Sequence, residues 1–157
     1  MSKSTPATAA LAKAGIAFEL HTYVYDPTAD RVGLQAAEAL GCPPGRMLKT
    51  LMVEIDGKPA CVVLPSDREV SMKRLAAAAG GKAAQMMKPA DAERVTGYKV
   101  GGVSPLGQRR RAPAFVEETA LDLDWVFVNG GQRGLQIRIA PRDLLTALDA
   151  VAAAVIA

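Results

Sequence analysis

Two kinds of short segment alternate along the chain. Segments rich in apolar, aromatic and β-branched residues predict strands, and they cover residues 18–25, 47–55, 60–65, 84–87, 114–118, 125–129 and 135–139. Segments bounded by capping residues, prolines and glycines predict helices, from Thr5-Pro6 to Gly15 and over 33–40, 71–79, 89–95 and 142–155. Helices and strands are therefore mixed along the whole length of the chain.

The connections between the predicted strands argue for a mixed sheet. Asp56-Gly57 is a hairpin signal between two strands, and the glycine-rich run 130–134 forms a turn between two more. This order lacks the regular strand–helix alternation of a doubly wound parallel sheet. We expect one α+β domain over residues 1–157, with a barrel-like mixed β-sheet flanked by helices, since no stretch is long enough to be a linker.

The composition limits the class of protein and the cellular compartment that we expect. Half of the 157 residues are apolar, as in a globular domain. No apolar run reaches the ~18 residues needed to span a bilayer, and the first residues lack the apolar core of a secretory signal. Cys42 and Cys61 have no metal or redox spacing and are expected to be free thiols. We expect a cytoplasmic protein with no membrane contact.

The positive charge gathers in the second half of the chain. The net charge is +3 and the pI is about 9.0, which permits contact with nucleic acid without requiring it. The second half holds Lys82, Lys88, Lys99, Arg109, Arg110, Arg111, Arg133 and Arg138. From charge alone, a solvated surface explains this distribution as well as a binding face does.

The sequence lacks the residues that several common catalytic and binding sites require. The single histidine, His21, excludes a multi-histidine metal centre, and no phosphate-binding loop or G-x-S-x-G nucleophile elbow is present. Cys61 lies in an apolar strand, where a thiol usually behaves as a small hydrophobic group. These residues therefore single out no metal centre and no activated nucleophile.

Lys49 is an unusual residue for its position. In "MLKTLMVEI" (47–55) it shares a strand face with Leu51, Val53 and Ile55. This is the more apolar face, so we expect it to be buried, with a lysine at one end. Such a lysine must extend to solvent, find a partner or shift its pKa. It is either a strand-end residue that reaches water or a cation aimed into a pocket.

The segment "TGYKVGGVSPLGQRRR" (96–111) combines four glycines, a proline and three arginines. Gly101-Gly102 would let the backbone approach a ligand and leave N–H groups free to hold a carbonyl oxygen or oxyanion. Pro105 would fix the end of the turn. On these residues alone, a turn-rich connector with a solvated basic end is the favoured interpretation.

Four segments together resemble the YbaK/EbsC family, freestanding relatives of the editing domain of bacterial prolyl-tRNA synthetases. They are "HTYVYDP", "MLKTLMVE", the block at 96–111 with its G-x-x-x-P signature at Gly101–Pro105, and "VNGGQRGLQIRIAP". The resemblance runs nearly end to end. It implies hydrolysis of the ester between cysteine and the transfer RNA for proline, Cys-tRNA(Pro). It also implies that the reaction needs no metal, no cofactor and no protein nucleophile, because the substrate's own thiol attacks its carbonyl.

The resemblance also implies roles for individual residues. Lys49 matches the family's critical lysine, and the Gly101 loop would hold the aminoacyl carbonyl or amino group. The expected substrate-binding residues are Tyr23, Thr50, Gly101, Gly102, Ser104, Pro105 and Asn129. Arg109, Arg110, Arg111 and Arg133 are expected to contact RNA phosphates. The expected partners are mischarged tRNA(Pro) and, as a candidate, prolyl-tRNA synthetase; the sequence does not define the oligomeric state.

The chain departs from the family pattern at two positions. Asn129 stands where family members carry serine, and Gln136 stands where they carry aspartate. These changes leave three alternatives open. The protein is an editing hydrolase with a different amino-acid preference, a non-catalytic module that binds transfer RNA or a synthetase, or a hydrolase of small thiol or amino-acid esters.

Overall fold

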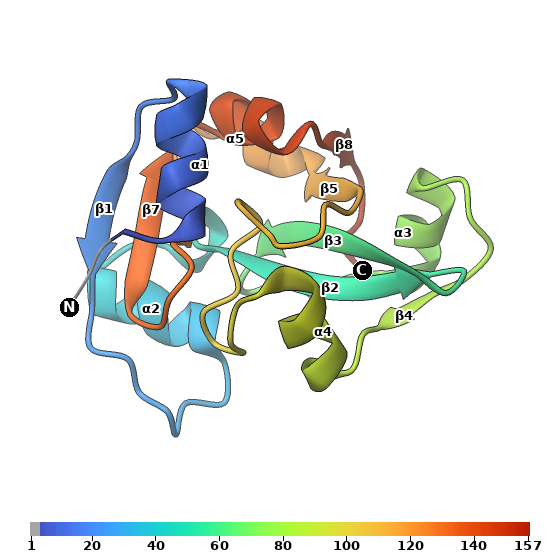
Figure 1. The fold of residues 1–157 in the computed structure, drawn as a ribbon, viewed down its shortest axis with the longest axis horizontal. Helices are drawn as coiled ribbons and strands as arrows, with labels where there is room; N and C mark the ends of the chain where they lie inside the picture. Colours follow the sequence, from blue (N-terminus) through green and yellow to red (C-terminus); the bar gives the residue numbers. More distant parts are fainter. Residues whose placement is uncertain (1–3) are drawn as a thin grey trace.

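The computed structural model, which describes residues 4–157, contains two β-sheets flanked by helices (Figure 1). The smaller sheet has the order β1-β7-β6 and is antiparallel. Its strands are β1 (Glu19–Thr22), β6 (Val126–Asn129) and β7 (Leu135–Ile139). The larger sheet has the order β4-β2-β3-β5-β8 and is mixed, with β5 parallel to both of its neighbours. Its strands are β2 (Leu48–Ile55), β3 (Lys58–Pro65), β4 (Ala84–Met86), β5 (Ala114–Glu117) and β8 (Val151–Ala153).

The helices follow the start and stop signals of the sequence. They are α1 (Pro6–Ala14), α2 (Val32–Leu40), α3 (Met72–Ala78), α4 (Pro89–Thr96) and α5 (Pro141–Leu148), with short 3₁₀ turns η1 (Pro44–Arg46) and η2 (Glu118–Asp122). At α1, the Thr5 hydroxyl accepts a hydrogen bond from Thr8 N at 3.2 Å, and Gly15 ends the helix in the left-handed conformation.

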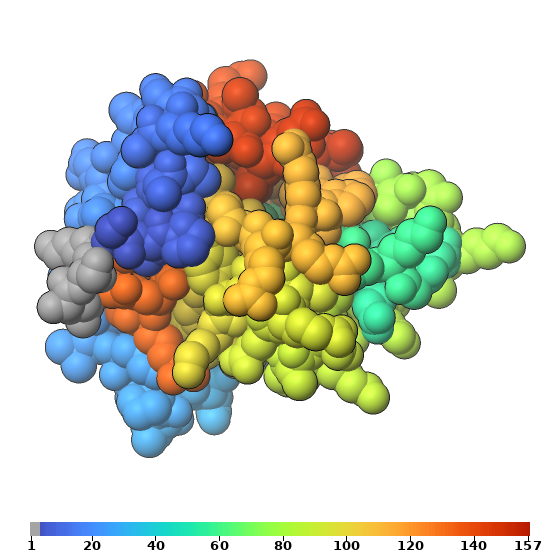
Figure 2. Space-filling model, in the orientation of Figure 1, coloured from blue at the N-terminus to red at the C-terminus, as the bar shows by residue number. Residues whose placement is uncertain are grey.

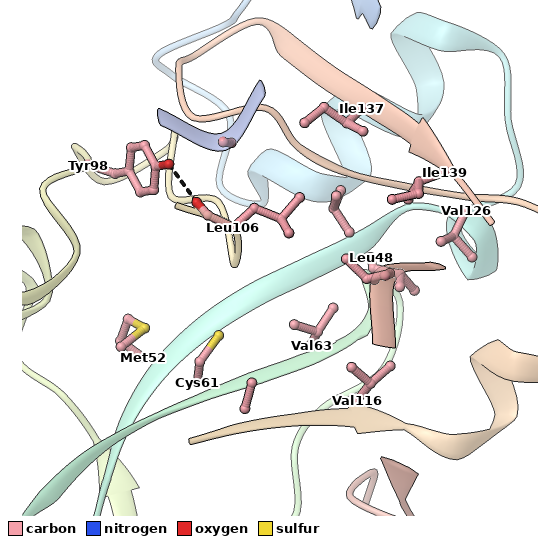
Figure 3. Packing of buried hydrophobic residues seen from close by; sticks show 14 of the residues in the cluster. Leu48, Met52, Cys61, Val63, Tyr98, Leu106, Val116, Val126, Ile137 and Ile139 are labelled. Atoms are coloured by element: carbon pink, nitrogen blue, oxygen red, sulfur yellow. Dashed lines mark hydrogen bonds between the residues drawn. The ribbon is translucent and has the colours of Figure 1, made fainter. Parts of the chain in front are cut away.

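The main core lies between the two sheets. Ile137 of the smaller sheet packs toward the side of the larger sheet that carries Leu48, Met52 and Val63 (Figure 3). Val128, its partner on β6, belongs to the same cluster. Helices α1, α4 and α5 contribute to this core. A second core packs the other face of the larger sheet against α3, and a third packs the other face of the smaller sheet against α2.

The expected α+β class is confirmed, but the strands do not close into a barrel. Strand pairing between the two sheets is limited, among the described residues, to one parallel bridge between Met47, just before β2, and Phe127 of β6. The predicted Asp56-Gly57 hairpin is present, with positive φ at both residues (51° and 81°), as a two-residue turn between β2 and β3 requires.

The prediction of a closing helix over 142–155 is wrong in its second half. Helix α5 ends at Leu148. The next residue, Asp149, caps the helix in the left-handed conformation with a φ of 49°, and β8 follows. The alanine-rich sequence favours a helix locally, but pairing with the open edge of β5 outweighs that preference. Glu117 fixes this arrangement, because its buried carboxylate accepts hydrogen bonds from Val155 N and Thr119 N. Burial alone would raise the pKa of Glu117, but these hydrogen bonds outweigh burial and lower it.

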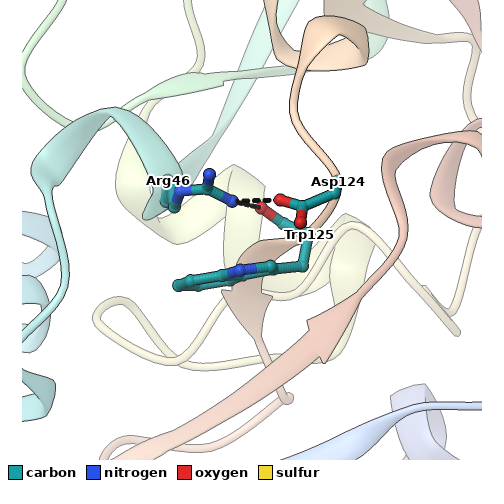
Figure 4. A network of polar contacts seen from close by, with 3 residues as sticks. All are labelled: Arg46, Asp124 and Trp125. Atoms are coloured by element: carbon teal, nitrogen blue, oxygen red, sulfur yellow. Dashed lines mark hydrogen bonds and ion pairs between the residues drawn. The ribbon is translucent and has the colours of Figure 1, made fainter.

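A polar network fastens the start of β2 to the start of β6 (Figure 4). Arg46 Nη1 lies 2.7 Å from Asp124 Oδ1 and 3.0 Å from Trp125 O. The guanidinium groups of Arg46 and Arg138 lie 4.4 Å and 4.2 Å from the centre of the Trp125 ring, within cation–π distance. This network holds the two sheets together beside the Met47–Phe127 bridge.

Candidate active site

A cavity of about 580 Å³ opens where β2 and β6 diverge beyond the Met47–Phe127 bridge. On the outer edge of β2, pairing with β4 begins only at Val53. Five consecutive residues before that point, 48–52, line the cavity. The opposite wall carries Asn129 and Gln136, which face each other across β6 and β7. The remaining walls come from the start of α2 (31–33), Ser66 and Glu69, the segment 86–92, and the loop residues Val100, Gly101 and Val103.

The free edge of β2 directs backbone groups into this cavity. Met47 O accepts a hydrogen bond from Ser66 N, on the side of β3. Hydrogen-bonding direction alternates along a strand, and Met52 O accordingly accepts from Met87 N on the other side. The backbone N–H and C=O of Thr50 therefore point away from β3, into the gap that β4 does not reach.

Lys49 reaches the cavity from the face of β2 that packs toward α3. Its side chain is 21% exposed, and its Nζ lies 3.9 Å from Glu69 Oε1. Arg31 Nη2 lies 3.8 Å from the same oxygen. Burial lowers the pKa of Lys49, Glu69 opposes this shift and Arg31 adds to it. Asp67 opposes the shift more weakly than Glu69, so Lys49 is a partly desolvated cation whose counterions are not in close contact with it. The sequence predicted burial only for the face of β2 that carries Lys49. In the structure, residues on both faces of β2 are buried.

The glycines of the G-x-x-x-P segment pack against the turn between β6 and β7. Gly101 has a φ of 91°, and a Cβ there would lie 2.7 Å from Tyr25 Oη. A Cβ on Gly102 would lie 2.8 Å from Arg133 N. Gly102 N donates to Lys99 O, so this N–H is not free as the sequence suggested. Of the predicted residues in this segment, Gly101 lines the cavity, whereas Gly102, Ser104 and Pro105 are buried behind it.

Asn129 joins the loop to the turn. Its Oδ1 accepts from Gly131 N at 2.7 Å, and its Nδ2 donates to Gly101 O at 3.4 Å. Asn129 therefore lines the cavity while its amide is engaged within the protein. Gln136, its cross-strand neighbour, is not engaged in this way, because its Oε1 is buried and has no hydrogen-bond partner among the described residues.

Two more buried oxygen atoms in this region lack a partner within the described part of the chain, Tyr23 Oη and Thr50 Oγ1. Thr50 lines the cavity, and Tyr23 lies behind it, in the core beneath α2. Burial raises the pKa of Tyr23, and the neighbouring Gln136 side chain partly offsets this effect. Because the Tyr23 hydroxyl and the Gln136 side chain are hydrogen-bonding neighbours, they can satisfy each other, and Thr50 Oγ1 is the buried oxygen of the cavity wall that a polar ligand would satisfy.

The predicted RNA-contacting arginines lie outside the cavity. Arg133 donates from Nε and Nη2 to Val100 O, at 3.0 Å and 2.8 Å, and its guanidinium lies over the ring of Tyr25. It thereby holds the loop against the turn. The arginines Arg109, Arg110 and Arg111 are exposed and follow the G-x-x-x-P segment in the chain. They belong to the stretch 104–113, which is gold in Figure 2. Arg111 Nη2 lies 3.5 Å from Asp149 Oδ2.

Sequence reasoning missed several residues of the cavity. Arg31 and Glu69 come from loops far from Lys49 in the chain, and only the fold brings them together. Within residues 4–157, no group of three or more His, Cys, Asp or Glu side chains is placed to hold a metal ion. No helix in that range is long and apolar enough to cross a membrane. Cys61 is buried in the main core, and burial raises its pKa to about 12.

Comparison with known proteins points to one family. Residues 26–147 match the aminoacyl-tRNA editing domain. A candidate Cys-tRNA(Pro)/Cys-tRNA(Cys) deacylase, EbsC of Enterococcus faecalis, is 39% identical over 112 residues, which cover 70% of this chain and 68% of EbsC. A proline–tRNA ligase of Acidithiobacillus ferrooxidans is 28% identical over 63% of this chain and 20% of the ligase. The crystal structure of a candidate trans-editing enzyme for prolyl tRNA synthetase superposes with a TM-score of 0.84 and 24% identity, over 99% of both chains, and supports the fold.

Proposed function

Because the chain belongs to the aminoacyl-tRNA editing domain family, we propose that it hydrolyses the ester bond of mischarged transfer RNA, with Cys-tRNA(Pro) as its substrate. The observation that carries the proposal is the position of Lys49. Its partly buried ammonium lines a cavity together with the free edge of β2 and the Gly101 backbone. This arrangement offers a cation and backbone dipoles to a carbonyl oxygen at the wall of the cavity.

The residues of the cavity suit catalysis by positioning. In the proposed reaction, the sulfur of the cysteinyl group bonds to its own carbonyl carbon. The ester C–O bond then breaks, and the thiol proton passes to the leaving ribose oxygen. Water opens the resulting cyclic thioester and releases cysteine. Lys49 stabilises the negative charge on the carbonyl oxygen, and Gly101 with the Thr50 backbone fixes the ester in place.

The mouth of the cavity suits the end of an RNA chain. Met86 and Val100 line it and are 50% and 45% exposed, which leaves an apolar surface for the terminal base. A cavity of about 580 Å³ has the size of sites that hold drug-sized ligands, so it has room for a nucleoside attached to the amino acid. Arg109–Arg111 would contact phosphates further along the RNA.

Prolyl-tRNA synthetase is the partner that we propose for RNA selection. The ligase relative contains a segment similar to this chain. A separate editing protein that draws on a synthetase for recognition needs little basic surface of its own, in keeping with a net charge of +3. Such a protein acts in the cytoplasm, where transfer RNA is charged.

One assay tests the function. Purified protein is incubated with tRNA(Pro) charged with cysteine, alanine or proline, and the remaining ester is measured over time against a protein-free reaction. We expect rapid loss of the cysteinyl ester alone. If no ester is lost faster than in the protein-free reaction, with or without prolyl-tRNA synthetase, the proposal is wrong.

A further inference from the structure

Two cations on one side of the cavity share a single carboxylate. Among the described residues that line the cavity, the charged ones are Arg31, Lys49 and Glu69. Arg31 Nη2 lies 3.8 Å and Lys49 Nζ lies 3.9 Å from the same oxygen, Glu69 Oε1. Both distances exceed the ~2.7–2.9 Å of a charge-assisted hydrogen bond. Asp67 lies outside the lining and acts on Lys49 more weakly than Arg31 does. The lining therefore carries an excess of positive charge, and the N–H donors of Arg31 are available to a ligand.

The backbone that carries Arg31 is held beside β2. Gly33, in the first turn of α2, packs directly on Ser66, because a Cβ on Gly33 would clash with Ser66 Oγ and would lie 3.9 Å from Lys49 Cβ. Ser66 Oγ in turn donates a hydrogen bond to Met47 O, just before β2. Arg31 precedes this contact by two residues, so its position relative to Lys49 is set by packing.

The two cations lie at different depths. The side chain of Lys49 is 21% exposed, whereas that of Arg31 is 61% exposed, which places Arg31 nearer to the mouth of the cavity. Because both side chains approach the same oxygen atom, one small ligand can reach both of them. Such a ligand would present an electron-rich group to Lys49 and an anionic group to Arg31.

The terminal nucleotide of an aminoacylated RNA carries its groups in this order. Its ribose bears the aminoacyl ester, and the 5′ oxygen of the same ribose bears the phosphate that joins the nucleotide to the rest of the RNA. When the ester carbonyl lies at Lys49, this phosphate points toward the mouth, through which the RNA must leave. A guanidinium binds a phosphate through two parallel N–H···O bonds, a geometry that an ammonium group lacks.

We propose that the Arg31 guanidinium binds the phosphate on the 5′ side of the terminal nucleotide and anchors that nucleotide with its ester at Lys49. The proposal rests on the proposed function and deepens it, because it assigns a site to a further part of the substrate. The base and the phosphate then contact different walls, since Met86 and Val100 come from β4 and the loop after α4, whereas Arg31 precedes α2.

The test compares two small substrates that differ only in this phosphate. They are adenosine and adenosine 5′-monophosphate, each esterified with cysteine on the ribose. The wild-type protein should prefer the phosphate-bearing ester by about 10-fold in kcat/KM, the lower end for hydrogen bonds to charged groups, because Arg31 is exposed to solvent. In Arg31→Gln this preference should fall close to 1. Arg31→Lys, which keeps the charge but not the planar fork, should retain part of it. The loss should appear in KM with kcat unchanged, because the phosphate contact is the same in the ground state and the transition state.

Arg68 provides a matched control. It is exposed, lies next to Glu69 in the chain and does not line the cavity. Arg68→Gln removes the same charge, so it should leave the phosphate preference unchanged if Arg31 acts by direct contact. An equal loss in both variants, a wild-type preference near 1, or a preference that survives in a folded Arg31→Gln protein overturns the proposal. Deacylation of both esters by the wild-type protein would leave the deacylase function intact in each of these cases.

A binding measurement separates this proposal from the proposed function. Calorimetry compares amide-linked cysteinyl-adenosine, which cannot be hydrolysed as an ester, with its 5′-phosphorylated form. Tighter binding of the phosphorylated form that is lost in Arg31→Gln and kept in Arg68→Gln supports the assignment even if the protein deacylates no RNA. Equal binding of both forms to the wild-type protein, or binding of neither, overturns it.

Discussion

Replacing Lys49 with methionine should remove the reaction without unfolding the protein. Methionine keeps much of the length of lysine but has no charge. Loss of one group that stabilises an oxyanion typically costs about 10²- to 10³-fold in kcat, or about 2.7–4 kcal/mol. Lys49 is 21% exposed, and Glu69, the acidic group within ion-pair distance, lies 3.9 Å away and is itself largely exposed, while Asp67 acts from further away. Such a pair contributes at most about 1 kcal/mol to stability, so Tm should change by no more than about 4 °C.

The assay is single-turnover deacylation of cysteinyl-tRNA, measured together with thermal unfolding of each variant. Wild-type turnover by a folded Lys49→Met protein would refute the role of the ammonium. A loss of activity accompanied by a large drop in Tm would show instead that Lys49 acts through the fold.

The pH dependence provides a further check of the same reasoning. The protonated lysine is the active form, and burial lowers its pKa. Activity, corrected for spontaneous hydrolysis, should therefore decline on the alkaline side below the ordinary lysine range near 10.4. Glu69 raises the pKa of Lys49. Glu69→Gln should thus move the decline to still lower pH, and a shift in the other direction would contradict the assigned electrostatics.

Four other variants test the walls and surroundings of the cavity. Gly101→Val combines a positive φ with a clash at the loop, and misplacement of the loop by about 1 Å should lower kcat/KM by about 100-fold; unchanged kinetics would make the loop a connector only. Reversing the charges of 109–111 should weaken RNA binding and reduce its salt slope by about 0.7 for each lost contact to single-stranded phosphate, and an unaltered slope would place the RNA elsewhere. Met86→Ser and Val100→Ser should each raise KM by about fivefold with kcat unchanged. Each side chain is about half exposed, so the substitution removes about half of its transfer free energy from the contact with the base. Val151→Ser, at a comparably exposed site on β8, is the control, and an equal effect there would exclude a base-binding surface.

The sequence defined the strands of this fold better than their closure. The hairpin at Asp56-Gly57 and the glycine-rich turn before Leu135 were predictable, because both depend on local conformations that few residues adopt. The separation into two sheets was not, since it depends on where β2 and β6 part. The end of helix α5 was also not predictable, because the open edge of β5 outweighs a local helical preference.

For the site, strand parity identified Lys49 from the sequence alone, because a charge in an apolar stripe is a local anomaly. The counterion Glu69 and the neighbouring Arg31 leave no such trace, since their approach depends on loops folded over the cavity. The glycines at 101 and 102 were identified for their freedom to approach a ligand. In the structure, that freedom is used first to fit the loop against the β6–β7 turn, and only Gly101 reaches the cavity wall.

A site that only positions its substrate must select cysteine through the chemistry of the cysteine side chain. A pocket that accepts cysteine cannot exclude alanine by size, because one methylene group is worth only about 1–3 kcal/mol. A reaction that uses the substrate thiol distinguishes them chemically, since alanine has no nucleophile and the hydroxyl of serine is far weaker than a thiolate. Cysteinyl-tRNA should therefore be hydrolysed much faster than the alanyl and seryl forms. S-methylcysteinyl-tRNA should resist hydrolysis and yet compete for the site. A loss greater than about 200-fold exceeds what one extra methyl group causes through fit alone. Rapid hydrolysis of the alanyl or S-methyl ester would exclude attack by the thiol, and the ester would then have to be attacked by water held at the Thr50 edge of β2.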